Sequence, residues 1–299
     1  MAWQRPMPPP APVTAATLPW NSLSLNSSMM PPSVDPSMLD RPMTPDQVSQ
    51  YKEAGYTIVP GFFAADETVA LKREVDRWIA GGLPRDVSVP DGKRNLQLIP
   101  LWPHSRLFRA LPFHPRVVAA VSALLGDPVV KILDQMFYKP PGDGMGTNWH
   151  TDNAYFRIPR PLRGCAMWIA IHDATRENGA LKVVPGVYER ELLHERDPDS
   201  DHHIRTYVDE SKAVHCELEA GGVVFFCFGT PHATGPNPSS RGRAGVGIHF
   251  VNMAQASEEM RAGSRWQHVH LTGEAASGGE REYGERVSFA AEMDLVAAG

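Results

Sequence analysis

The chain has 299 residues, 42% of them hydrophobic, and a formal net charge of -5 at pH 7. This length and composition favour one globular domain with appendages. There is no basic excess of the kind that recruits nucleic acid or an anionic membrane surface, so a small-molecule substrate is the favoured partner. The sequence does not indicate an oligomeric state.

Cysteine usage and hydropathy limit the choice of compartment. The three cysteines, Cys165, Cys216 and Cys227, are an odd number and form no C-x-x-C pair. They indicate neither a disulfide framework nor a thiolate zinc site. No run reaches the roughly 18 apolar residues that cross a bilayer, and the N-terminus lacks the basic and apolar regions of a secretion signal. These features favour a cytoplasmic protein.

The first 43 residues differ in composition from the rest of the chain. They are rich in Pro, Met and Ser, carry almost no charge and show no regular period, which predicts a disordered tail. Ordered structure is predicted from Thr44-Pro45-Asp46-Gln47, where a threonine N-cap, a proline in the first turn and a glutamine at the third position form a capping box. Gly55 ends this helix. We therefore expect a tail over 1–43 and a single domain over 44–299.

Helices are predicted in the N-terminal part of this domain and strands after it. A strand is expected over 56–59, followed by helices over about 66–81 and 114–125. The buried face of the first of these helices is predicted to carry Val69, Leu71, Val75 and Trp78. From Val129 onward, β-branched or aromatic runs are separated by Gly, Pro and Asn turns. These runs cover 130–138, 165–172, 181–184, 222–228 and 244–251. The pattern predicts a mainly β protein with a double-stranded β-helix (jelly-roll) core over about 129–255 and flanking α-helices.

Three side chains have the types and spacing of a metal site. His150 and Asp152 are separated by one residue, so on an extended strand both leave from the same face. A third ligand must come from elsewhere in the fold, and His232 lies in a turn just after the apolar run 222–228. Two imidazoles and one carboxylate form the facial triad of non-haem Fe(II) oxygenases, which leaves positions for a chelating co-substrate and dioxygen. Zinc would more usually close its shell or keep a single water.

Arg243 is a candidate anchor for that co-substrate, eleven residues after His232. On a strand it shares one face with Gly245, Gly247 and His249. A guanidinium beside two glycines offers a fork for a carboxylate and space for the rest of a dicarboxylate. Arg241 has the same parity, so parity alone does not choose between the two. Arg243 is favoured because Arg241 lies in the polar turn with Ser239-Ser240.

Structural readings of these residues stay open. His150 fits a hydrogen-bonded strand histidine beside an ion-paired Asp152, without a metal. The other histidines of interest are interpreted as structural or solvent-exposed: His172, His249 and the pair His202-His203. The strand that carries His150 is followed by three residues that fit either substrate contact or loop packing: Tyr155, Phe156 and Arg157.

Several further runs accompany these residues between positions 130 and 252. They are Tyr138-Lys139-Pro140-Pro141-Gly142, Trp149-His150-Thr151-Asp152, Trp168 with Asp173-Ala174-Thr175, Glu177-Asn178-Gly179-Ala180-Leu181 with Val184-Pro185-Gly186, and His232-Ala233-Thr234-Gly235-Pro236-Asn237 through Arg243. In them the chain resembles the phytanoyl-CoA dioxygenase family, whose members include ectoine hydroxylases and many natural-product hydroxylases. The predicted helices between 44 and 126 also resemble the N-terminal part of that family.

The resemblance implies an Fe(II)/2-oxoglutarate-dependent dioxygenase. Such an enzyme uses O2 to hydroxylate an unactivated C–H bond of a small-molecule metabolite, and it releases succinate and CO2. The implied metal ligands are His150, Asp152 and His232, and the implied salt bridge to 2-oxoglutarate comes from Arg243. Further co-substrate contacts are implied for Gln135, Trp168 and Thr234. Core filling by Gln135 and Trp168, and turn capping by Thr234, are the structural alternatives.

Other functions compete with this interpretation. A halogenase replaces the carboxylate ligand by a small residue so that chloride can bind iron, and Asp152 argues against it. A non-catalytic jelly-roll binding or regulatory protein would keep the pocket without turnover, and succinate release would separate the two. A zinc hydrolase is disfavoured because that function assigns no role to Arg243. The sequence does not choose among acyl-CoA, amino-acid-like and secondary-metabolite substrates, nor between hydroxylation and desaturation.

Overall fold

The computed structural model of the chain describes residues 42–87, 94–198, 204–263 and 265–298, and every structural statement below concerns these ranges. The predicted tail over 1–43 lies outside them except for its last two residues, and so does the pair His202-His203. Met43, assigned to the tail, is buried in the core at 6% exposure. Within these ranges no helix has both the length and the apolar character that crossing a bilayer requires.

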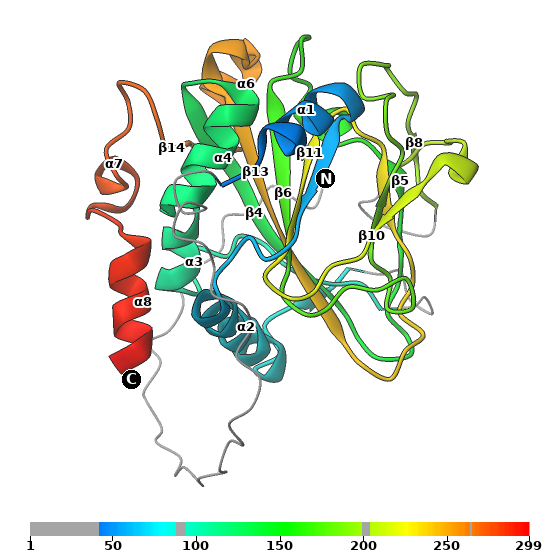
Figure 1. Ribbon diagram of the computed structural model, residues 1–299, viewed down its shortest axis with the longest axis horizontal. Helices are drawn as coiled ribbons and strands as arrows, with labels where there is room; N and C mark the ends of the chain where they lie inside the picture. Colours follow the sequence, from blue (N-terminus) through cyan, green and yellow to red (C-terminus); the bar gives the residue numbers. More distant parts are fainter. Residues whose placement is uncertain (1–41, 88–93, 199–203, 264, 299) are drawn as a thin grey trace, which may run out of the picture. The chain divides into compact units, whose positions relative to one another are not determined.

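The protein is built mainly from antiparallel strands in two sheets (Figure 1). The large sheet has the strand order β1-β11-β6-β13-β4-β3-β2, and β14 also pairs with β4. The smaller sheet has the order β10-β7-β12-β5, while β8 and β9 pair with each other. The strands are β1 (Tyr56–Val59), β2 (Arg85–Asp86), β3 (Leu96–Leu98), β4 (Val129–Lys139), β5 (Thr147–His150), β6 (Gly164–Ala170), β7 (Leu181–Val183), β8 (Glu195–Arg196), β9 (Ile204–Arg205), β10 (Val214–Cys216), β11 (Val223–Cys227), β12 (His232–Thr234), β13 (Arg243–Asn252) and β14 (Val269–His270).

Helices cover one side of the large sheet, and the smaller sheet lies on its other side (Figure 1). Helices α3, α4 and α8 lie on the covered side, with α2 next to α8. The helices are α1 (Pro45–Ala54), α2 (Ala65–Ala80), α3 (Arg106–Ala110), α4 (Pro115–Leu125), α5 (Asn153–Phe156), α6 (Glu258–Ala262), α7 (Glu280–Tyr283) and α8 (Phe289–Ala298).

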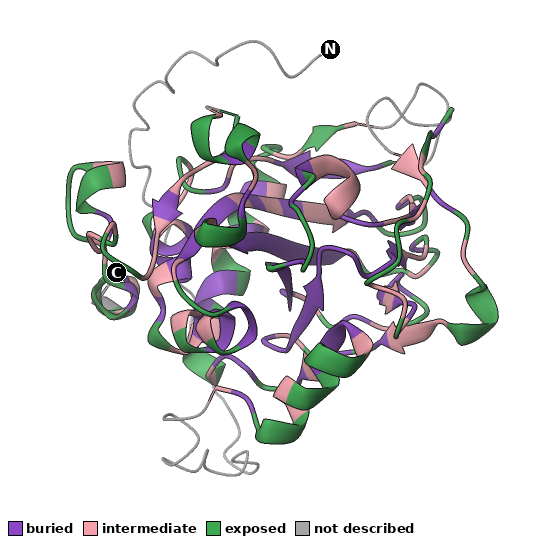
Figure 2. Cartoon of the chain, turned by 90° about the horizontal axis from the view of Figure 1, so that it is seen from above, coloured by how far each residue is buried: buried purple, intermediate pink, exposed green. Residues whose placement is uncertain are grey.

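Alternate residues of the large sheet face two different cores. Ile169 of β6 and Val246 of β13 pack with helix residues such as Leu124 in the larger apolar cluster. Trp168, one residue before Ile169, instead packs with Leu181 of the smaller sheet in a second cluster. Seen from above, buried residues fill the middle of the molecule (Figure 2). Because successive side chains of a strand point to opposite faces, residues with the parity of Trp168 line the space between the sheets.

The predicted start and end of the first helix are confirmed. Thr44 Oγ1 accepts from the Gln47 amide at 3.2 Å, and Gln47 Oε1 accepts from the Thr44 amide at 2.8 Å. These two bonds satisfy backbone donors that an α-helix leaves free in its first turn. Gly55 ends the helix at φ 82°, a left-handed conformation that glycine adopts without steric cost.

The second predicted helix is confirmed as α2, but one residue of its predicted face is wrong. Leu71, Val75 and Trp78 are buried as expected, whereas Val69 is 64% exposed. Ala70 takes the buried position instead. At 3.6 residues per turn Val69 is about 200° around the helix from Leu71, so it points to the other side.

The predicted runs correspond to strands β4, β6, β7, β11 and β13, with ends shifted by one or two residues. Strands β10 and β12 of the smaller sheet were not predicted, because each has only three residues and shows almost no period. The segment after Ala256, whose placement the sequence did not indicate, folds into α6, β14, α7 and α8.

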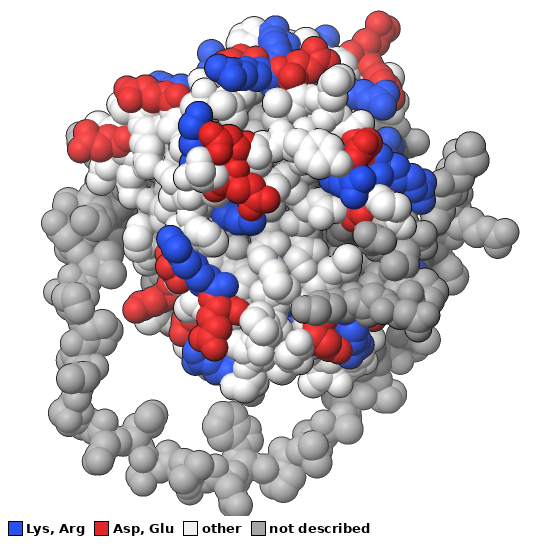
Figure 3. Space-filling view, turned by 90° about the vertical axis from the view of Figure 1, so that its right-hand side faces the viewer, with Lys and Arg blue, Asp and Glu red and all other residues white. Residues whose placement is uncertain are grey.

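The side of the molecule formed by the smaller sheet carries charges of both signs. Figure 3 looks at this side, and its described Lys and Arg side chains lie among Asp and Glu. Neighbouring charges form ion pairs there, such as Lys182 with Glu210 at 3.0 Å and Arg205 with Glu195 at 2.7 Å. These pairs are at the surface and contribute little to stability.

Candidate metal centre

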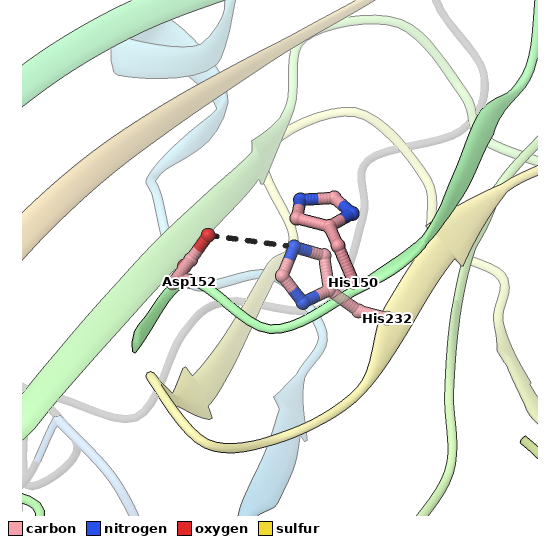
Figure 4. A group of neighbouring side chains, drawn as sticks. All are labelled: His150, Asp152 and His232. Atoms are coloured by element: carbon pink, nitrogen blue, oxygen red, sulfur yellow. Dashed lines mark ion pairs between the residues drawn. The ribbon is translucent and has the colours of Figure 1, made fainter. Parts of the chain in front are cut away.

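The three predicted metal ligands lie together. His150 is the last residue of β5 and His232 the first of β12, and they are register partners in the smaller sheet. Their ring centroids are 4.2 Å apart. Asp152 Oδ1 lies 3.7 Å from His232 Nε2, the ion pair drawn in Figure 4. One ligand atom from each residue lies within 4.8 Å of the others, so a single ion can contact all three.

The local backbone differs from the expectation at two of these positions. Strand β5 ends at His150, and Asp152 has φ -61° and ψ -31°, as the residue that precedes helix α5. The extended-strand argument for a shared face is therefore wrong, and the two side chains converge because the chain turns between them. His232 was expected in a turn and instead lies in the short strand β12.

Backbone contacts favour the tautomer of both histidines that leaves Nε2 free for a metal ion. His150 Nδ1 lies 2.8 Å from the backbone oxygen of Asn148, and His232 Nδ1 lies 3.0 Å from that of Thr230. A carbonyl oxygen only accepts hydrogen bonds, so each Nδ1 carries the proton and each Nε2 keeps its lone pair. Burial also lowers the pKa of His232, which keeps this ring neutral at pH 7. Such backbone contacts commonly orient metal-binding histidines.

Asp152 is a buried carboxylate without a cationic side chain of Lys or Arg beside it. In the described part of the chain the basic side chains within 4 Å of its oxygens are the imidazoles of His232, at 3.7 Å, and His249, at 3.3 Å. Burial raises the pKa of this carboxyl, but its electrostatic interactions with the neighbouring imidazoles of His232 and His249 outweigh the effect of burial and lower the pKa to about 2. Asp152 is therefore ionised at neutral pH, and the set of two neutral imidazoles and one carboxylate suits a divalent cation.

Arg243 is buried between the sheets and has no acidic partner among the residues that the structure describes. Its side chain has 0% exposure, Nη2 donates to the backbone oxygen of Gly179, and Nε has no hydrogen-bond partner among the described residues. Burial lowers the pKa of its guanidinium to about 9. Arg241 is exposed and lines an outer pocket of about 360 Å³ with Lys72 and Asp76. Of the two arginines, only Arg243 points its charge into the space between the sheets.

A second buried basic side chain lies directly opposite Arg243. Lys139 of β4 is the register partner of Arg243, and burial and then the charge of Arg243 hold its pKa well below the ordinary value. Its Nζ donates to the backbone oxygen of Gly235 at 2.7 Å and to that of Met145. Like charges opposite each other destabilise a sheet. An anion between the sheets would favour the charged form of both groups.

The two glycines that follow Arg243 have different surroundings. A Cβ on Gly245 would lie 2.4 Å from the Trp168 ring, so the indole already fills the space beside this glycine. A Cβ on Gly247 would meet Gln135 Cγ at 3.7 Å, which is ordinary contact distance. Trp168 also lies under Arg243, with 5.5 Å between the guanidinium carbon and the ring centroid. The expectation that both glycines leave space holds for Gly247 and is wrong for Gly245.

The remaining predicted contacts are placed as follows. Gln135 of β4 is half-buried and is the register partner of Gly247 on the inner face. The Thr234 hydroxyl lies 2.7 Å from that of Thr147 and accepts from the Thr147 amide at 3.1 Å. Thr234 therefore links β12 to β5, which is more than the turn cap considered from the sequence.

Sequence reasoning underrated two residues of this site. His249 was interpreted as structural or exposed, but it has 4% exposure and its Nε2 lies 3.3 Å from Asp152 Oδ2. Its parity with Arg243 was the available signal. Lys139 belongs to the Tyr138–Gly142 run, and only the register of β4 with β13 brings it opposite Arg243. His172 is structural as expected, 2.8 Å from Asp76.

Comparisons with known proteins agree with this geometry. The family model of phytanoyl-CoA dioxygenase (PhyH) matches residues 51–245. Methylphosphonate hydroxylase of Gimesia maris is 26% identical over 248 residues, which cover 80% of this chain and 92% of the relative. Peroxisomal phytanoyl-CoA dioxygenase of Mus musculus is 25% identical, with 81% and 78% covered. A probable phytanoyl-CoA dioxygenase of Caenorhabditis elegans is 31% identical, but the match spans only 46% of this chain and 49% of the relative.

Solved structures share the fold at lower identity. The epimerase SnoN in complex with Fe3+, alpha ketoglutarate and nogalamycin RO is 23% identical with a TM-score of 0.58, covering 73% of this chain and 85% of SnoN. EctD from S. alaskensis with 2-oxoglutarate and 5-hydroxyectoine is 21% identical with a TM-score of 0.59, covering 72% and 78%. The family match extends over more than half of the sequence and includes the whole triad and Arg243. The chain therefore belongs to the phytanoyl-CoA dioxygenase family.

Proposed function

We propose that this protein is an Fe(II)/2-oxoglutarate-dependent dioxygenase that hydroxylates a C–H bond of a small-molecule metabolite. One observation carries the proposal: the triad His150, Asp152 and His232 can contact a single ion, and the uncompensated guanidinium of Arg243 is fully buried on the face of β13 from which His249 reaches Asp152 at 3.3 Å. The first can hold a divalent metal ion, and the second needs an anion. A chelating dicarboxylate satisfies both.

In this proposal His150 and His232 bind iron through Nε2, and Asp152 binds it through its carboxylate. Two nitrogen ligands and one oxygen ligand on one side of the ion suit Fe(II) and leave positions for other molecules. When bound, iron with 2-oxoglutarate and dioxygen supplies the oxidising chemistry, with succinate and CO2 as products. The protein then has to bind, orient and exclude water, and it needs no separate acid or base.

The co-substrate role falls to the inner face of the large sheet. Arg243 would hold the far carboxylate of 2-oxoglutarate with its free Nε and the remaining guanidinium donors. Lys139 would add positive potential from the opposite position on β4. Trp168 and Gln135 would flank the carbon chain, and Thr234 would contact it from β12. Burying a cation without a counter-ion lowers the stability of the folded protein, so binding of the anion would stabilise it.

Hydroxylation and the jelly-roll arrangement are part of the proposal. Two facing antiparallel sheets with the site between them support a double-stranded β-helix core. Relatives named methylphosphonate hydroxylase and ectoine dioxygenase support oxygen insertion into a small molecule. An epimerase and a carbocyclase of similar fold catalyse other outcomes by their names, so product analysis has to identify the reaction.

Two rival functions make different predictions. A halogenase needs an open position where Asp152 stands, and the buried, ionised carboxylate disfavours it. A non-catalytic binding protein would bind Fe(II) and 2-oxoglutarate but release no succinate when candidate substrates and O2 are supplied.

The test begins with oxygen-free titration of Fe(II) and 2-oxoglutarate into the purified protein, followed by succinate measurement after O2 and candidate substrates are added. We expect one Fe(II) per chain and substrate-stimulated succinate. His150→Ala and His232→Ala should each lose metal binding and turnover. His114→Ala is the matched control, because this imidazole pairs with Glu67 at 2.9 Å, away from the triad. Full iron occupancy and turnover in both triad variants would refute the metal assignment.

A further inference from the structure

The two oxygens of Asp152 face different histidines. Oδ1 lies 3.7 Å from His232 Nε2, on the side of the metal ligands. Oδ2 is buried and receives no hydrogen bond within the ranges the structure describes, yet His249 Nε2 lies only 3.3 Å from it. A buried carboxylate oxygen without a donor is costly. One donor, already within 3.3 Å, would satisfy it.

His249 reaches Asp152 from the opposite sheet. It lies on β13 of the large sheet, whereas two of the metal ligands lie on β5 and β12 of the smaller one. The pairing of β13 with β4 shifts register between His249 and Phe250, so that Ile132 is an additional residue on the partner strand. Irregularities of this kind re-aim side chains beside active sites. The His249 ring also packs beside the stacked rings of Phe156 and Phe228, at centroid distances of 5.2 and 6.0 Å.

The proton of the His249 ring can be assigned from its surroundings. Nδ1 is buried and has no hydrogen-bond partner in the described part of the chain. A buried N–H without an acceptor is rare in proteins, whereas an unused acceptor is tolerated more often. A carboxylate oxygen only accepts hydrogen bonds. A neutral ring with its proton on Nε2 therefore fits both the nearby Asp152 Oδ2 and the absence of an acceptor at Nδ1 among the described residues.

We infer that His249 is a positioning residue for Asp152: its Nε2–H donates to Oδ2 and leaves Oδ1 as the single carboxylate oxygen for the metal. His249 is not part of the group of three ligands whose atoms share one ion. If Asp152 bound through both oxygens it would occupy one more coordination position, and a facial triad works by keeping positions open. The inference rests on the proposed function and adds a residue that sets the coordination number.

Four substitutions separate hydrogen bonding from packing. His249→Phe keeps an aromatic ring beside Phe156 and Phe228 but removes the donor. His249→Gln places an amide nitrogen near the position of Nε2, whereas His249→Asn is too short to reach Oδ2. His114→Phe is the matched control, because it breaks an imidazole–carboxylate pair with Glu67 at a remote site. Thermal unfolding identifies folded variants, and His249→Leu replaces the phenylalanine variant if that one does not fold.

The readouts are the Co(II) affinity from calorimetry and the absorption spectrum of bound Co(II), neither of which depends on turnover. Changing a group that orients a metal ligand typically costs about 10–100-fold in metal affinity, and we expect this loss in His249→Phe and His249→Asn. His249→Gln should keep most of the affinity and the wild-type spectrum, and His114→Phe should keep both. His249→Phe and His249→Asn should also change the spectrum, because Asp152 is then free to bind through both oxygens.

Two failures are distinguishable. If the wild-type protein binds no metal, the proposed function fails. If the wild type binds Co(II) and the phenylalanine and asparagine variants match it in affinity and spectrum, the inference about His249 fails alone. Equal losses in the Gln, Asn and Phe variants would also overturn it, because they would point to packing of the imidazole and not to its hydrogen bond.

Discussion

The two faces of strand β13 differ in chemistry, although every residue from Arg243 to Asn252 is buried. One face carries Ala244, Val246, Ile248 and Phe250, which pack in the apolar cluster under the helices. The other carries Arg243, Gly245, Gly247 and His249. Burial therefore does not distinguish structural from functional positions in this strand. The two kinds of position differ in whether neighbouring protein atoms provide hydrogen-bond partners for the polar atoms that are buried there.

The side chains of the outer face are apolar and need only van der Waals contacts. Polar atoms at the inner face lack hydrogen-bond partners from the part of the protein that the structure describes. Arg243 Nε, Asp152 Oδ2 and His249 Nδ1 are all buried without a hydrogen-bond partner among the described residues. Natural proteins keep few such groups, and each one needs an explanation. Arg243 and His249 share one face of β13, and Asp152 approaches that face from the other side, so ligands bound between the sheets would explain these three atoms. Substitutions on the two faces should therefore affect different measurements.

The largest effect is expected at Arg243. Removing one partner of a buried charge pair costs about 3–5 kcal/mol, so Arg243→Ala should weaken 2-oxoglutarate binding by roughly two to three orders of magnitude. Arg243→Lys should recover part of this, because a point charge cannot make the two-pronged contact. Arg241→Ala changes an exposed side chain and should stay within about 1 kcal/mol. Titration of the iron-loaded, oxygen-free variants measures these affinities, and a larger loss in Arg241→Ala would reverse the assignment.

On the outer face, Ile248→Ala should act on stability alone. Ile248 has 1% exposure, and truncating such a side chain to alanine costs about 2–5 kcal/mol of unfolding free energy. Denaturant unfolding of the metal-free protein measures this loss. Under conditions where the variant is folded, its Fe(II) and 2-oxoglutarate affinities should equal those of the wild type. A large loss of affinity in the folded variant would show that the two faces are not independent.

The two inner glycines offer a matched pair with smaller effects. Gly245→Ala forces a methyl group to within 2.4 Å of the Trp168 ring, and overpacking of this kind costs about 1–3 kcal/mol of stability. Gly247→Ala meets its nearest neighbour, His249 Cε1, at 3.6 Å and should change stability by less than about 1 kcal/mol. Its methyl group should instead obstruct 2-oxoglutarate. Thermal unfolding and co-substrate titration of both variants test this, and unimpaired binding in Gly247→Ala would place the co-substrate elsewhere.

The smallest effect is expected from deleting residues 1–40. The composition of this segment predicts too little apolar surface to form a core of its own. The deletion keeps Met43, which is buried, and Thr44, which caps α1. The unfolding temperature and the affinity for 2-oxoglutarate should both be unchanged. Loss of either one would mean that the segment belongs to the domain or to an interface between subunits.

Parts of the fold and of the candidate site were predictable because their signals are local. The capping box at Thr44 is a four-residue pattern, and the parity of Arg243 with His249 follows from strand geometry alone. Two imidazoles and one carboxylate, from His150, Asp152 and His232, also indicate a metal site from their residue types alone. Each of these inferences needs only residues within one element or a set of ligand types.

The rest depends on how separate elements meet. The approach of His249 to Asp152 requires two sheets to face each other, and no pattern within β13 encodes that distance. Trp168 fills the space beside Gly245 because β6 is the neighbour of β13, which is a matter of strand order. The turn at Asp152 was missed because a two-residue spacing is compatible with both a strand and a helix start. Sequence reasoning therefore predicted which residue types belong together at the candidate site better than how their side chains are arranged.

Lys139 has a consequence for how the site takes up its ligands. Its Nζ joins the backbone of Gly235, three residues after His232, to that of Met145, five residues before His150. Both ligand-bearing segments are thereby tied to β4 before any ion arrives. Uptake of the metal should then proceed with a small change in heat capacity, and the amides of these segments should be protected from hydrogen exchange to the same degree with and without metal.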